Sequence, residues 1–489
     1  MRHSACLALL ALLPLRDIRA AEYFVDARAS GQAVQEGSAA QPWGDIVTGV
    51  SRLSPGDTLS IRPGLYRQRE IKIEADDVRV RKDPAVPGVV AIDGDVPLHE
   101  LKNQDADGRQ KTWDNGPFFH PAIVVTGNGV ALEGLEVRHA FMGISMRGER
   151  STVRACHVHH VGQHGIEVMN HQGLVEDCIV HDANLYNVNG QCLVGGQDPA
   201  TGAPNQNIRK KIASPDPARN GKNMDWGQGI TFHGKYREAW APRGCILRRN
   251  VVWSIWGEGV ATYNASDVRI EDNVAINIWR VAYYVQNADS VTLDGNLAFY
   301  ERDFRARLGD GAMALCYSFA NEYPADLLRV ASGSDQPLVP DCSDVALTNN
   351  ISWRGDYALH SGDRHPVGTR GPIRIENNIL LHPAVAPCIN LNASVVGPVE
   401  IHHNFLGREG GGTEESGRFI ALADGIKATV SNNRFYAPDP GTDPFATAMD
   451  ESLKGLFTQA RQAWPDRLEA LRTEINSVRQ RFHGLSQNP

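Results

Sequence analysis

A histidine, a tyrosine and several basic side chains gather in the middle of the sequence, and their types are those that move protons. His233 is followed closely by Lys235 and Arg237, and Tyr263 and Arg280 come in the two segments after it. Imidazole and phenol groups act as general acids and bases, and cationic groups stabilise negative charge that develops on a reacting molecule. This set suits proton abstraction from a carbon next to a carboxylate, provided that the fold brings the side chains together.

A repeated pattern supplies the elements that position these residues. Val268-Arg-Ile270-Glu-Asp-Asn273 is followed by Val291-Thr-Leu293-Asp-Gly-Asn296, in which two apolar residues alternate before an asparagine. The template recurs at Cys245/Leu247/Asn250, Val345/Leu347/Asn350, Ile373/Ile375/Asn378, Val399/Ile401/Asn404 and Ala428/Val430/Asn433. Three earlier copies place another residue in the asparagine position: Val130/Leu132/Leu135, Ser151/Val153/Cys156 and Gly173/Val175/Cys178.

This repeat predicts an all-β solenoid of about ten or more rungs, because a unit that cannot bury its own apolar face packs on copies of itself. Alternation with a period of two indicates strands rather than helices. Stacked strands lie about 4.8 Å apart. At that spacing each asparagine can donate to one neighbour and accept from the next, so that a buried row of amides is satisfied along its length.

The second strand of each unit can be aligned because Asn264-Ala-Ser-Asp-Val268 matches Asn287-Ala-Asp-Ser-Val291. This alignment predicts two inward columns, Ile166/Ile230/Val260/Tyr283 and Val168/Phe232/Thr262/Val285. The residues between them face outward by alternation, in the rows Glu167/Thr231/Ala261/Tyr284 and Met169/His233/Tyr263/Gln286. His233 and Tyr263 are therefore predicted side by side on adjacent rungs, on the solvent side of the sheet, with Arg280 at the matching turn.

The amino terminus predicts export. Residues 1–20 combine an early basic pair, an apolar run from Ala5 to Leu15 and the small-residue pattern Ile18-Arg-Ala20, which is typical of a signal peptide. That apolar run is too short to span a membrane, so we expect a secreted or periplasmic protein that is not membrane-bound.

The cysteines that remain after such cleavage fall into two kinds. Cys156 and Cys178 occupy the core column and are predicted to be buried thiols. Cys316 and Cys342 flank an inserted segment, and a disulfide between them would close it.

The repeat also sets the domain boundaries. Residues 21–436 are predicted to form the solenoid, with insertions at about 183–228 and 301–342 and an amphipathic capping helix from Ile46 to Leu53. Residues 437–489 lose the repeat and predict a proline-rich linker followed by a helical cap from Met449 to Phe482, broken at Pro465. With both ends capped, we expect a monomer.

Charge distinguishes the classes of partner. The chain has a formal net charge of −8, which argues against a nucleic-acid binder. The first insertion is nevertheless basic, with Lys222 beside Trp226, and Arg305 adds to this bias in the second. A basic patch on an acidic protein attracts a polyanion, and a polysaccharide rich in uronic acids fits.

The opening segment carries a family resemblance. Pro55-Gly-Asp-Thr-Leu-Ser-Ile-Arg-Pro-Gly-Leu-Tyr66, with Ile92-Asp-Gly94 later, resembles the amino-terminal region of exported right-handed parallel β-helix proteins of the pectate-lyase type. The resemblance covers roughly residues 22–436. It implies the right-handed parallel form of the solenoid.

A narrower resemblance concerns the site. Chondroitinase B and the related alginate lyases have a basic residue on an outward strand position, another about one rung away, and calcium held by acidic side chains. His233 and Tyr263 lie in similar places, although the base in those enzymes is lysine. The resemblance implies Ca²⁺ as a cofactor, with Glu167 and Glu258 as its ligands.

These observations predict a polysaccharide lyase that cleaves an acidic, uronic-acid-containing polysaccharide by β-elimination. The predicted catalytic residues are His233, Tyr263 and Lys235. The predicted substrate-binding residues are Arg237, Arg280, Tyr236, Tyr284, Trp226, Lys222 and Arg305.

Other functions on the same fold stay open. One is a non-catalytic acidic-glycan-binding surface protein, and others are a uronate C5-epimerase or a glycoside hydrolase. The sequence lacks the Gly-His-Gly and Arg-Ile-Lys motifs of polygalacturonases and the Asp-Pro-His motif of alginate epimerases. A further outward row, with His159, His160, His181 and Asp182, suits a metal or proton-transfer site as well as a structural role.

Overall fold

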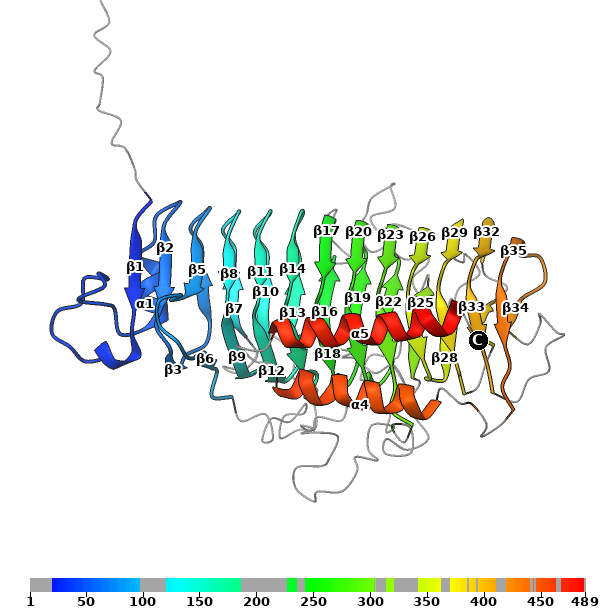
Figure 1. Ribbon diagram of the computed structural model, residues 1–489. Helices are drawn as coiled ribbons and strands as arrows, with labels where there is room; N and C mark the ends of the chain where they lie inside the picture. The colour runs from blue at the N-terminus through cyan, green and yellow to red at the C-terminus, as the bar shows by residue number, and fades with distance from the viewer. Residues whose placement is uncertain are drawn as a thin grey trace, which may run out of the picture.

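The computed structural model describes most of the chain. The described residues are 20–96, 120–185, 227–234, 242–302, 304, 314–320, 342–361, 370–384, 387–392, 395–409, 419–439, 443, 446–462 and 468–487. Figure 1 shows an elongated cylinder of stacked strands with two helices along one side.

Three parallel sheets form the walls of the cylinder, and successive strands along the chain pass from one sheet to the next. Sheet A contains, in spatial order, β1 (Glu22–Val25), β2 (Thr58–Ile61), β5 (Arg79–Lys82), β8 (Ala131–Glu133), β11 (Thr152–Arg154), β14 (Leu174–Glu176), β17 (Arg243–Arg248), β20 (Ser266–Glu271), β23 (Asp289–Asp294), β26 (Ser343–Thr348), β29 (Arg370–Glu376), β32 (Pro398–His402) and β35 (Lys427–Ser431).

Sheet B contains β3 (Gly64–Arg67), β6 (Val90–Asp93), β9 (Leu135–Ala140), β12 (His157–Val161), β15 (Ile179–His181), β18 (Val251–Trp253), β21 (Val274–Ile276), β24 (Leu297–Phe299), β27 (Ile351–Trp353), β30 (Ile379–Leu381), β33 (Phe405–Gly407) and β36 (Arg434–Tyr436). Sheet C contains β4 (Ile71–Ile73), β7 (Pro121–Val125), β10 (Met142–Met146), β13 (Ile166–Val168), β16 (Gln228–His233), β19 (Glu258–Tyr263), β22 (Val281–Gln286), β25 (Leu315–Ala320), β28 (Tyr357–Ser361), β31 (Ile389–Leu391) and β34 (Ile420–Leu422). The predicted parallel β-helix is confirmed.

The asparagine column is a continuous hydrogen-bonded ladder between sheets A and B. The Asn273 Oδ1 atom accepts from the backbone N–H and the side-chain amide of Asn250, at 2.9 and 3.0 Å. The Asn273 amide donates to Asn296 Oδ1 and to the Leu247 carbonyl. The same contacts continue to Asn433, and at the other end Asn250 Oδ1 accepts from the backbone of Cys178. The prediction of a satisfied amide row is confirmed.

One end of the cylinder is covered by α1 (Ile46–Ser51), which follows a short 3-10 helix, η1 (Ala27–Ala29). Asp45 caps α1, because its carboxylate accepts from the backbone N–H of Thr48 at 2.7 Å. Ile46 and Val50 are buried in the main core, so the helix closes the apolar interior at the first rung. The helix ends at Ser51, slightly earlier than the predicted Leu53.

Two carboxy-terminal helices, α4 (Ala446–Gln462) and α5 (Leu468–Gln487), run side by side along the outer face of sheet B, as Figure 1 shows. Their apolar faces pack in one cluster with outward side chains of β18, β21 and β24, including Trp253, Ile276 and Phe299. These strands are buried at every position, which is the pattern of strands covered on both faces.

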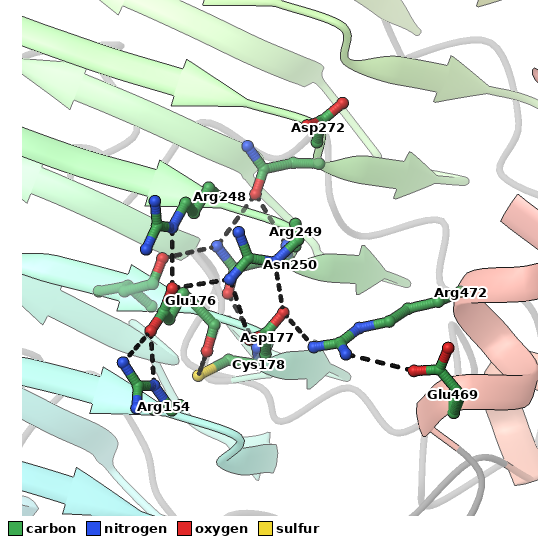
Figure 2. A network of polar contacts seen from close by, with 12 residues as sticks. Arg154, Glu176, Asp177, Cys178, Arg248, Arg249, Asn250, Asp272, Glu469 and Arg472 are labelled. Carbon is green, nitrogen blue, oxygen red and sulfur yellow. Dashed lines mark hydrogen bonds and ion pairs between the residues drawn. The ribbon is translucent and has the colours of Figure 1, made fainter. Parts of the chain in front are cut away.

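A network of ion pairs on the cylinder extends to α5 (Figure 2). The buried carboxylate of Glu176 accepts from Arg154, Arg248 and Arg249. The neighbouring Asp177 pairs with Arg249 and, across to α5, with Arg472. Burial alone would raise the pKa of both carboxyl groups, but the arginine hydrogen bonds outweigh burial and lower both pKa values.

Two details of the chain differ from the predictions. Leu315–Ala320 lies inside the predicted second insertion but forms β25, a regular strand of sheet C whose Tyr317 pairs in register with Tyr283. Cys316 is a free, buried thiol that donates to the Arg354 carbonyl, so the predicted disulfide with Cys342 is wrong. Cys156 and Cys178 are buried free thiols, as predicted.

Replacing Asn273 by alanine should lower the free energy of unfolding by about 1–3 kcal/mol, because the buried N–H of Asn250 and the Leu247 carbonyl lose their partner. Asn433→Ala at the half-buried end of the ladder is the matched control and should cost less. Urea unfolding measures both. Equal losses would contradict a ladder whose strength comes from burial.

Glu176→Gln should destabilise the protein at pH 7 by about 1–3 kcal/mol, since charged hydrogen bonds to three arginines are lost. The folded-state pKa of Glu176 is lowered, so its contribution is present above the ordinary carboxyl pKa and is lost as pH falls through the lowered value. Unfolding measured from pH 7 to pH 3 should therefore show the two proteins converging in acid. The control is Glu469→Gln, which removes an exposed carboxylate that pairs with Arg472; a similar loss there would refute the assignment.

Candidate active site on sheet C

The register of sheet C is the predicted one. Ile166 pairs with Ile230, Ile230 with Val260, and Val260 with Tyr283. In the same register His233 pairs with Tyr263, and these two rings meet edge to face with centroids 5.7 Å apart. The prediction that they project side by side from the outer face is confirmed.

The outer face of this sheet is less open than predicted. The Tyr263 side chain is buried, and Thr231, Ala261, Tyr284 and Gln286 in the same rows are buried as well. The His233 side chain retains 30% exposure. The prediction of two solvent-facing rows is therefore wrong for most members, whereas His233 remains in contact with solvent.

The imidazole of His233 contacts the buried carboxylate of Glu167. Its Nδ1 atom lies 3.3 Å from Oε1 of Glu167, which is on β13, and the same oxygen lies 4.0 Å from Nε2 of His164. The other Glu167 oxygen accepts from the hydroxyl of Ser145, on β10, at 3.2 Å. An imidazole that donates from Nδ1 to a carboxylate keeps Nε2 unprotonated, so this contact orients His233 as a base.

The charge states of this group follow from its surroundings. Burial would raise the pKa of Glu167, but the hydrogen bond with His233 and the adjacent imidazoles outweigh it and lower that pKa to about 2. Burial lowers the pKa of His164 to about 4, against the opposing pull of Glu167. At neutral pH the group therefore contains one ionised carboxylate and a neutral His164.

A second carboxylate, that of Glu258, accepts a hydrogen bond from Tyr263. The Tyr263 hydroxyl donates to Oε2 of Glu258 at 2.8 Å. The side-chain amide of Gln228 donates to that oxygen and to the Tyr263 hydroxyl, both at 2.9 Å. The phenolic oxygen therefore accepts from Gln228 and donates to Glu258, and these two contacts fix the position of the Tyr263 hydroxyl.

The remaining predicted residues divide by position. Tyr284 lies beside Tyr263, with ring centroids 5.9 Å apart. Arg280 directly precedes Val281, whose backbone pairs with that of Glu258. The backbone N–H of Arg280 donates to the Gly257 carbonyl at 3.1 Å, so Arg280 begins the strand next to Glu258. The other predicted residues lie outside the described residues, and their roles stay predictions: Lys235, Tyr236, Arg237, Trp226, Lys222 and Arg305.

Calcium, which the resemblance implied, does not fit the donors described here. Ca²⁺ takes six to eight oxygen ligands. Glu167 instead faces two imidazoles, and Glu258 is engaged by Gln228 and Tyr263. Among the described residues His164, Glu167 and His233 form a set of two nitrogens and one carboxylate, which suits ions of the zinc class better.

His164 and Gln228 were missed by sequence reasoning, although the sequence carries a signal for them. His164-Gly-Ile166, Gln228-Gly-Ile230 and Glu258-Gly-Val260 share one pattern, a polar residue, a glycine and an inward aliphatic residue. In the register of the sheet these triplets stack. The polar members therefore form a column of their own along the edge of the site.

Comparison with known proteins supports the fold. No family model matches the sequence, and no curated protein matches it. A rhamnogalacturonan lyase structure matches with a TM-score of 0.50 and 12% identity, over 84% of this chain and 87% of its own. Pectate lyase Pel9A matches with a TM-score of 0.46 and 13% identity, over 88% and 84%. An alginate lyase from Paenibacillus sp. str. FPU-7 gives 0.44 and 11%, over 73% and 95%.

This chain is thus a right-handed parallel β-helix. An identity this low shows the fold alone. None of the described helices is long and apolar enough to cross a membrane.

Proposed function

We propose that this protein is an exported polysaccharide lyase that cleaves a uronic-acid-containing polysaccharide by β-elimination at the outer face of sheet C. The observation that carries the proposal is a partly exposed imidazole, His233, oriented by the buried, ionised Glu167 and placed against Tyr263. An oriented base beside a second proton-transfer group is what an elimination requires.

Each step of the elimination is assigned to one side chain. His233 Nε2 takes the C5 proton of the uronate, and the electron pair released forms the C4=C5 double bond. The C4–O bond breaks as the Tyr263 hydroxyl turns from Glu258 and gives its proton to the leaving oxygen. Gln228 donates to the resulting phenolate, and proton return from His233 through solvent restores both groups. Arg280 is the candidate that neutralises the uronate carboxylate.

Hydrolysis on this site would need an acid other than Glu167. An inverting or retaining glycosidase needs one protonated carboxylic acid to donate to the leaving oxygen. Glu167, with a pKa lowered to about 2, stays ionised at neutral pH and does not serve as that acid. Epimerisation begins with the same proton abstraction, and product analysis distinguishes it because no double bond forms.

The purified protein, incubated with a panel of uronic-acid polymers, should generate the ultraviolet absorbance of the C4=C5 double bond. Tyr263→Phe and His233→Gln should each lower kcat by about 10²–10⁴-fold, the usual contribution of a general acid or base. Tyr357→Phe is the control, because Tyr357 packs at the border of the same apolar cluster without a proposed role. If a polymer binds and none yields unsaturated product, the protein is a glycan-binding module instead.

Glu167 is proposed as a positioning residue. In Glu167→Gln the amide can donate to His233 Nδ1, which favours the tautomer with a proton on Nε2 and removes the base. We expect a loss of about 10²–10⁴-fold in kcat with little change in KM. Glu167→Asp should restore part of the activity. A change in KM alone would instead indicate a role in binding substrate.

A further inference from the structure

A second polar cluster lies on another wall of the cylinder, on the outer face of sheet B. It contains four imidazoles and two carboxylates, and we call it the imidazole cluster: Glu136, His157, His159, His160, His181 and Asp182. These residues come from β9, β12 and β15 and from the turn after β15. All six residues are buried or partly buried, and the side chains of His159 and His181 are only 12% and 14% exposed.

The cluster begins where the apolar strip under the helices ends. One outward row of sheet B runs from His159 to His181 and then to Trp253, as the strand pairing shows. The His181 ring stacks on Trp253 at 4.3 Å, and Trp253 in turn contacts Phe457 of α4. Packing under the helices explains the apolar part of the row but not its replacement by imidazoles.

Each carboxylate orients one histidine. Asp182 Oδ2 lies 2.8 Å from His181 Nδ1, and Glu136 Oε1 lies 3.5 Å from His159 Nε2. The second nitrogen of each oriented ring then faces another imidazole nitrogen. His181 Nε2 is 2.8 Å from His157 Nε2, and His159 Nδ1 is 2.7 Å from His160 Nδ1.

This is the arrangement found around metal ligands, in which a carboxylate binds one ring nitrogen and leaves the other for the ion. Two imidazole nitrogens at such short distances accommodate at most one proton or one cation between them.

We propose that the imidazole cluster binds a divalent transition-metal cation of the zinc class. In each of two sets, Glu136/His157/His159 and His160/His181/Asp182, one ligand atom per residue lies within 4.8 Å of the others. On binding, the carboxylate of a set exchanges its contact with the histidine for one with the ion. Imidazole with carboxylate is a donor set that zinc accepts, at about 2.0–2.2 Å. Small ring movements from the present contacts open the space for the ion.

The chain offers a matched control for the test. His402 and His403 also have their Nδ1 atoms close together, 3.0 Å apart, with Glu376 3.8 Å from His402. His160 and His403 share a left-handed backbone, at φ 51° and 57°, which asparagine tolerates. Among the described residues, the control pair belongs to one set of three possible metal ligands, Glu376, His402 and His403, whereas the imidazole cluster contains two such sets.

Untagged protein, dialysed against Zn²⁺ at neutral pH and then analysed for metal, should retain about one equivalent or more per chain and gain thermal stability. All variants carry His233→Gln, so that the sheet C set of His164, Glu167 and His233 loses a ligand. In that background His159→Gln/His160→Asn removes one ligand from each set of the imidazole cluster and should abolish both effects, whereas His402→Gln/His403→Asn should retain them. Zinc retained by the cluster variant, or lost from the control variant, would overturn the proposal.

A measurement on the His233→Gln protein, in which the imidazole cluster is intact, covers the case in which the cluster variant does not fold. X-ray absorption at the zinc edge should show at least about two imidazole ligands. A coordination shell made only of oxygen would overturn the proposal. Either result is independent of whether the protein has lyase activity.

Discussion

Stacking of equivalent positions along the cylinder is the constraint on which the rest of the structure depends. In the asparagine ladder the amide of one rung accepts from the rung before it and donates to the rung after it, as Asn273 does between Asn250 and Asn296. A buried amide with an unmatched neighbour costs free energy, so each copy of the ladder favours the same register in the next. Because a slip of one residue would exchange the two faces of every strand, the ladder also determines which side chains reach the outer face of sheet C.

A second stacked column positions the candidate active site. Gly165, Gly229 and Gly259 approach one another so closely that a Cβ atom on each would lie 2.5, 2.6 and 2.7 Å from the carbonyl oxygen of Gly229, Gly259 and Ala282, respectively. Only glycine permits this approach. The preceding polar residues thereby stack with little separation, and this brings Gln228 within reach of both Glu258 and Tyr263.

The sequence predicted the strand pairing and the facing of side chains, which follow from the repeat. It did not predict the features that the repeat leaves open. The pairing of His233 with Tyr263 was predictable because alternation and the repeat fix both strand and face. The burial of Tyr263 was not, because alternation gives the face of a strand but not how tightly its side chains pack; in the structure Tyr263 lies in one apolar cluster with Val281 and Tyr284. Strand β25 was hidden inside a segment that breaks the spacing of the repeat. The docking site of the helices left a signal, since β18, β21 and β24 are apolar at successive positions.

The contrast between two covered outer faces bears on function. On sheet B the covered strip is apolar, and its burial against α4 and α5 needs no polar partner. On sheet C the buried outer face contains two carboxylates and two glutamines, which cost free energy to remove from water unless they are fully hydrogen-bonded. Apolar residues would cover this sheet at lower cost, as they do on sheet B. Packing therefore does not account for Glu167 and Glu258, whereas the orientation of His233 and Tyr263 does.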